Sequence, residues 1–83
     1  IMTKEEFIDL MKQWGVSSRF YSVDGKGKEY AVNLEKLSTN LYSVYYLERG
    51  ERIESKNFTK IEDAYDEVAR IIKGWIDVGF DVK

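Results

Sequence analysis

The side chains of this sequence that could act on a substrate are mainly its carboxylates, because the 83 residues include neither histidine nor cysteine. Those absences exclude a zinc finger, a thiol nucleophile and a Ser-His-Asp triad. Glu48, Glu51 and Glu54 lie close in sequence around one predicted hairpin, and a carboxylate pair can supply the acid and base of a glycosidase. Such a pair needs a cleft, which so short a chain builds with difficulty. We therefore expect no enzyme activity and no metal or other cofactor.

A glycine-rich segment, Asp24-Gly25-Lys26-Gly27-Lys28, raises the question of phosphate binding, since glycine lets backbone N–H groups approach an anion closely. The segment lacks the G-x-x-x-x-G-K-[ST] spacing and does not run into a predicted helix. It therefore favours a flexible loop between two strands.

Length and charge narrow the class of protein further. A chain of 83 residues fits a single domain, residues 1–83. Thirteen basic against 15 acidic residues give a net charge of −2, which argues against general nucleic-acid binding, since that activity normally shows a basic stripe. No apolar run approaches the roughly 20 residues that span a bilayer, and the N-terminal segment does not have the pattern of a signal peptide. We expect a cytoplasmic protein without a membrane partner.

Two helices are predicted at the ends of the chain. Thr3 and Glu6 form a capping box, and apolar residues at helical spacing follow, so the first helix covers about residues 4–14. A second capping box, Thr59 to Glu62, begins the last helix, which Gly79 ends. Core packing is the expected role of the tryptophans on their apolar stripes, Trp14 and Trp75.

Between the helices, four segments have the composition and alternation of strands: residues 19–23, 29–35, 41–48 and 52–58. Short turns between them predict a meander. The expected fold is therefore α+β: a helix, a four-stranded antiparallel meander sheet and a helix, with both helices packed on one face of the sheet.

The strand 41–48 places aromatic residues on both of its faces. Tyr42 and Tyr46 point one way with Val44, whereas Tyr45 points the other way with Leu47. Only one face of such a sheet is covered by helices, so one set lies partly on the open face. Either these are ordinary tyrosines of a half-exposed strand, or they form a protein-binding patch. Periodicity does not decide which tyrosines are buried.

The segment Tyr42-Ser-Val-Tyr-Tyr-Leu-Glu-Arg-Gly-Glu-Arg52, followed by Phe58 and then by Glu62-Asp63-Ala64, resembles small immunity proteins of bacterial polymorphic toxin systems. The pattern of those proteins is W-x-V-Y-Y-x-E-R-G-x-R, a short strand that ends in Phe, and an acidic-Ala helix start. The likeness covers roughly residues 27–72. Tyr42 stands here in place of the expected Trp.

The resemblance implies an α+β protein without catalysis that binds a cognate toxin domain and occludes its active site. If the toxin is a nuclease, acidic side chains of the inhibitor would stand in for phosphates. The residues that we expect to bind this partner surround the hairpin at 49–51. They are Tyr21, Tyr45, Glu48, Arg49, Glu51, Arg52 and Glu54.

Two other functions remain open. The order of helix, strands and helix also resembles the double-stranded RNA-binding domain, but that module has a basic cluster where this chain has Glu62 and Asp63. A phage-encoded inhibitor of a defence enzyme would have nearly the same sequence properties as an immunity protein. The last residues, Phe80 to Lys83, could pack, fray or pair with another chain.

Overall fold

The computed structural model describes all residues, Ile1 to Lys83, as an α+β fold with one sheet. Two α-helices and four strands are joined in the order α1, β1, β2, β3, β4, α2, and a short 3₁₀ helix, η1, precedes β1. Their bounds are α1 Lys4–Trp14, η1 Ser18–Phe20, β1 Tyr21–Ser22, β2 Ala31–Ser38, β3 Leu41–Glu48, β4 Glu51–Phe58 and α2 Ile61–Asp77.

The sheet is mixed, so the predicted all-antiparallel meander is wrong at its first pair. The strand order is β1-β2-β3-β4, and β1 runs parallel to β2, whereas the other two pairs are antiparallel. The first two residues of the predicted strand 19–23 belong instead to η1, which Ser17 caps, and only Tyr21 and Ser22 remain to pair. Residues 23–30 then carry the chain back to the start of β2 instead of reversing it in a tight hairpin.

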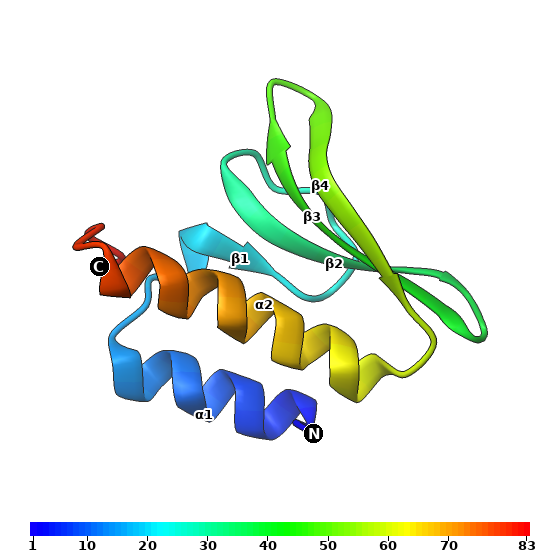
Figure 1. Cartoon of the computed structure of the whole chain (residues 1–83), viewed down its shortest axis with the longest axis horizontal. Helices are drawn as coiled ribbons and strands as arrows, with labels where there is room; N and C mark the ends of the chain where they lie inside the picture. Colours follow the sequence, from blue (N-terminus) through cyan, green and yellow to red (C-terminus); the bar gives the residue numbers. More distant parts are fainter.

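The two helices lie side by side on the same side of the sheet and run in the same direction (Figure 1). Helix α2 packs against β2, β3 and β4, while α1 packs against α2. The edge of the Phe7 ring in α1 also meets the ring of Tyr21 in β1, with centroids 5.3 Å apart. The buried core lies between these layers. Neither helix has both the length and the apolar character needed to cross a membrane.

Of the two predicted capping boxes, the structure contains the one at α1 but not the one at α2. At α1 the capping box is confirmed: the Thr3 hydroxyl accepts a hydrogen bond from the Glu6 N–H, and the Glu6 carboxylate accepts one from the Thr3 N–H. At α2 it is wrong, because the capping position falls on Lys60, which offers no acceptor oxygen. Glu62 and Asp63 in the first turn instead complement the helix dipole.

A β-bulge interrupts β4 and sets which of its side chains face the helices. The register passes from Val44 opposite Lys56 to Tyr46 opposite Ile53, so that Glu54 and Ser55 share one position across from β3. Glu54 has a left-handed backbone conformation, with φ 55°. The bulge thereby directs Ile53 to the same side of the sheet as Tyr46, which is the side of α2.

Asn33 fastens the segment 23–30 to the open face of the sheet. Its side chain is almost completely buried, accepts a hydrogen bond from the Lys28 N–H at 2.8 Å, and donates to the carbonyls of Lys28 and Ala31 at 3.0 Å. Near it, the backbone N–H of Tyr30 donates to the carbonyl of Leu47. A side-chain amide thus takes the place of the strand pairing that the loop lacks.

We predict that Asn33→Ala lowers the free energy of unfolding by about 2–3 kcal/mol, because the N–H and carbonyl of half-buried Lys28 and the carbonyl of buried Ala31 lose their partner. Urea denaturation measures this loss. The control is Asn57→Ala on exposed β4, which is expected to change stability by less than about 0.5 kcal/mol. Equal stabilities of the two variants would contradict the role given to Asn33.

Candidate partner-binding site

The residues that the sequence predicted as a binding surface are spread over three parts of the structure. Tyr21 lies on the helix side of the sheet, against Phe7. The tip of the β3–β4 hairpin carries three exposed ones, Glu48, Arg49 and Glu51. Of the remaining three, Tyr45 and Arg52 lie together on the open face, and Glu54 lines a groove on the opposite side.

On the open face, Tyr45, Arg52 and Glu35 form a closed cluster. The Tyr45 hydroxyl donates to the Glu35 carboxylate at 3.0 Å, and the Arg52 guanidinium lies 2.8 Å from the same carboxylate oxygen. The guanidinium carbon also lies 4.3 Å from the centroid of the Tyr45 ring. Only 3% of Tyr45 remains exposed. In this state the cluster links β2, β3 and β4 and leaves little of the Tyr45 ring for a partner.

The pKa of Tyr45 is raised above its usual 10.0, first by burial and then by the hydrogen bond to Glu35, since both disfavour the phenolate. A phenol whose pKa is higher in the folded than in the unfolded state contributes stability that is complete below pH 10 and is lost as pH rises. We predict that Tyr45→Phe costs about 1 kcal/mol at pH 7, and that this difference shrinks above pH 10. Urea denaturation at both pH values checks it. The control is Tyr42→Phe, because the Tyr42 hydroxyl has no hydrogen-bond partner within the protein. If the stability difference between wild type and Tyr45→Phe were the same at both pH values, the role given to the Tyr45 hydroxyl would be contradicted.

The largest apolar hollow is a groove of about 620 Å³ between the C-terminal half of α2 and the hairpin half of β3 and β4, elements that Figure 1 places facing one another. Eight of its nine lining residues are hydrophobic, and the ninth is a carboxylate. The residues are Phe20, Tyr30, Tyr46, Ile53, Glu54, Ile71, Trp75, Val78 and Phe80. We call this surface the aromatic groove.

Edge-to-face contacts build the floor of the aromatic groove around Trp75. Its ring centroid lies 5.9 Å from that of Tyr46, 6.4 Å from that of Phe20 and 5.8 Å from that of Phe80. Such contacts hold the rings in fixed orientations. At the rim, about half of the surface of both Tyr30 and Phe80 remains exposed. The groove is thus an exposed apolar surface that needs little ordering when it binds.

Two residues that line the groove have unfavourable backbone conformations. Tyr30 has φ 59° and Glu54 has φ 55°, and the one other left-handed residue that is not glycine is Arg49 at the neighbouring hairpin tip. For an L-residue this conformation costs about 1–2 kcal/mol. Residues held in this way against their preference concentrate at functional sites. The strain therefore marks the same surface as the exposed aromatic rings.

The hairpin tip and the groove are joined by Glu29. Its carboxylate accepts a hydrogen bond from the N–H of Gly50 at 3.0 Å, which holds residues 29 and 30 beside the tip. The pKa of Tyr46 in the groove is raised by burial and by the nearby charges of Glu48 and Glu29. The hairpin end of the groove is therefore an acidic environment.

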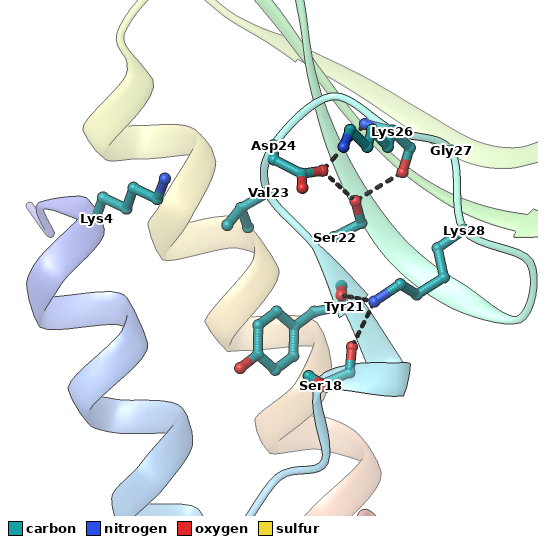
Figure 2. Close-up of a pocket in the computed structure, with 9 residues that line it drawn as sticks. All are labelled: Lys4, Ser18, Tyr21, Ser22, Val23, Asp24, Lys26, Gly27 and Lys28. Carbon is teal, nitrogen blue, oxygen red and sulfur yellow. Dashed lines mark hydrogen bonds between the residues drawn. The ribbon is translucent and has the colours of Figure 1, made fainter.

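The glycine-rich segment lines a second, smaller hollow of about 360 Å³ beside α1, shown in Figure 2. The Asp24 carboxylate accepts from the N–H of Lys26 and from the Ser22 hydroxyl, which also lies 2.7 Å from the Lys26 carbonyl. The ammonium group of Lys28 donates to the carbonyls of Ser18 and Tyr21. The Lys26 N–H and the Lys28 ammonium group are thus already bound within the protein, which supports the role of this segment as a connection.

The sequence did not predict most of the aromatic groove. Of the residues predicted to bind a partner, only Glu54 lines it. A signal was present: the apolar residues Val78 and Phe80 continue past the end of α2, where a surface tail would be polar. No protein-family model, curated protein or solved structure gave a significant match to this chain.

Proposed function

We propose that this protein is a non-catalytic binding protein that neutralises a bacterial toxin domain, and that the toxin docks on the aromatic groove. The toxin partner is what the resemblance of residues 27–72 to immunity proteins implies. The observation that supports binding is the groove itself: a preformed, exposed hollow with rings of Tyr30 and Phe80 at its rim. Aromatic residues are the commonest anchors of protein interfaces.

The mechanism of neutralisation would be steric. A partner side chain that fills the groove brings the adjoining hairpin, residues 48–51, against the partner's surface. Because the rings around Trp75 already contact one another, little entropy is lost on binding. A toxin domain held in this way would have its active site or substrate path covered.

The charges at the start of α2 support a protein partner over an RNA partner. A double-stranded RNA-binding domain presents lysines there to phosphates. Here Glu62 and Asp63 occupy the first turn, and Asp66 and Glu67 follow. Asp66 and Glu67 are in ion pairs, but the unpaired carboxylates of Glu62 and Asp63 would repel a phosphate backbone.

A toxicity-rescue assay tests the proposal. The C-terminal domain encoded by the gene next to this one is expressed in a bacterial host with and without this protein. We expect growth to be rescued and a complex to be recovered from the lysate. Toxicity with neither rescue nor complex would contradict the proposal. Binding to a phage-defence enzyme instead would favour the inhibitor alternative, and a salt-dependent shift of duplex RNA would favour the nucleic-acid one.

A further inference from the structure

We infer that the occupant of the aromatic groove is a basic segment of the partner: an apolar anchor side chain flanked by lysine or arginine. This inference rests on the proposed function, and it adds the chemistry of the surface that the partner must present. It follows from the charges that the structure places around the hairpin end of the groove.

Four carboxylates surround that end. Glu54 is the polar residue of the groove lining. Glu29 is bound to the backbone of the hairpin turn at Gly50. Glu48 and Glu51 occupy the two strands at the turn and are directly opposite one another. All four are exposed, and none lies within 4.0 Å of a lysine or arginine nitrogen.

The pairing of Glu48 with Glu51 is unfavourable in the free protein. Like charges directly opposite one another in an antiparallel pair repel and destabilise the sheet. An arriving cation would relieve this repulsion. A positively charged partner at this position would therefore make the free energy of binding more favourable, although the same two carboxylates do not stabilise the free protein.

The cations nearby do not neutralise this end of the groove. Arg49 is exposed at the turn, and its single positive charge does not balance the four carboxylates. Arg70 binds the Glu67 carboxylate through two nitrogens, at 2.8 and 2.7 Å, and its charge also acts on Glu54, although it forms no ion pair with it. Arg19 belongs to η1, does not line the groove, and lies over the ring of Phe20, with its guanidinium carbon 4.9 Å from the ring centroid. A carboxylate-rich rim beside an apolar floor fits an apolar residue with basic neighbours.

Selection from a displayed library of random 12-residue peptides tests the inference and does not require that the toxin be identified. The wild-type chain serves as the bait, and the double variant Tyr30→Ala/Phe80→Ala, which has the same net charge, is used for counter-selection. We expect the peptides that depend on the groove to combine an aromatic or aliphatic residue with two or more lysines or arginines. Neutral or acidic groove-dependent peptides, or no dependence on the groove, would overturn the inference.

Matched charge variants test whether the carboxylates beside the groove are the ones that attract the basic peptides. Glu48→Gln/Glu54→Gln is expected to weaken the selected peptides at least tenfold at low salt, and less at high salt. Glu5→Gln/Asp9→Asn removes two charges from exposed positions of α1 and is expected to leave affinity within twofold. An equal loss in both variants would mean that net charge alone attracts the peptides and would overturn the inference.

The two proposals fail separately. If growth is rescued but the selected peptides are not basic, the charge inference is wrong and the toxin-binding function stands. If basic peptides occupy the groove but the toxin is neither bound nor neutralised, the groove binds a basic segment of another protein.

Discussion

Replacement of Phe7 by alanine is expected to lower the free energy of unfolding by about 3–5 kcal/mol, the usual cost of a buried Phe→Ala change. Phe7 is completely buried, and its ring contacts Tyr21 of β1 and Tyr65 of α2, with centroid distances of 5.3 and 5.7 Å. It is one of only two buried residues in α1. Loss of this ring removes the side chain that joins α1 both to the sheet and to α2.

Urea denaturation followed by circular dichroism measures the effect. For a domain of this size, total stability is only on the order of 4–12 kcal/mol, so Phe7→Ala removes a large share of it. Phe7→Leu keeps most of the volume and gives a smaller loss, which stays measurable if the alanine variant does not fold. The matched control is Phe80→Ala, the same chemical change at a half-exposed ring, with an expected cost of about 1 kcal/mol. Similar losses for Phe7→Ala and Phe80→Ala would contradict the packing described for α1.

The second large effect is expected on binding. Tyr30→Ala and Phe80→Ala should each weaken the complex with the proposed toxin partner by about 2 kcal/mol, which is about 30-fold in Kd, because each removes an exposed aromatic anchor. At position 30, alanine has the same backbone penalty at positive φ as tyrosine, so the loop conformation is preserved. Isothermal titration calorimetry with the purified toxin domain measures the change.

The variant Arg52→Ala distinguishes binding at the aromatic groove from binding at the open face of the sheet. Arg52 lies over Tyr45 on the open side of the sheet, with nearly half of its side chain exposed, and it belongs to the surface predicted from the sequence. If the groove is the binding site, this variant should change Kd less than threefold. A large loss with Arg52→Ala and none with the groove variants would move the interface to the open face.

Local patterns accounted for much of the fold. The capping box at Thr3 and the apolar stripe after it predict α1 with its observed bounds, 4–14. The β-branched and aromatic run at 41–48 and the turn at 49–51 predict β3 and its hairpin, although Glu51 already belongs to β4. These features depend on residues within one or two turns of the chain, so they can be read from the sequence.

Pairing between distant segments was not predictable in the same way. The segment before residue 24 has the composition of a strand, yet Ser17 and η1 leave only two residues to pair, in parallel, with β2. The loop that follows is held by Asn33, whose role as a replacement for strand hydrogen bonds has no periodic signal. Alternation also did not show that Tyr45 is buried on the open face, because Arg52 and Glu35 cover it from neighbouring strands.

Local patterns were sufficient to predict the α+β class, the bounds of α1 and β3, and the presence of aromatic and acidic side chains around the hairpin, whereas the predicted bounds of β1 and β2 were wrong. Where those side chains gather depends on how the distant elements pack. The aromatic groove is made by η1, the loop before β2, the β3–β4 hairpin, α2 and the tail, and the bulge at Glu54 turns one acid toward it. Its residues extend along the chain from Phe20 to Phe80. Long-range packing of this kind depends on the simultaneous burial of several elements, which no local pattern encodes.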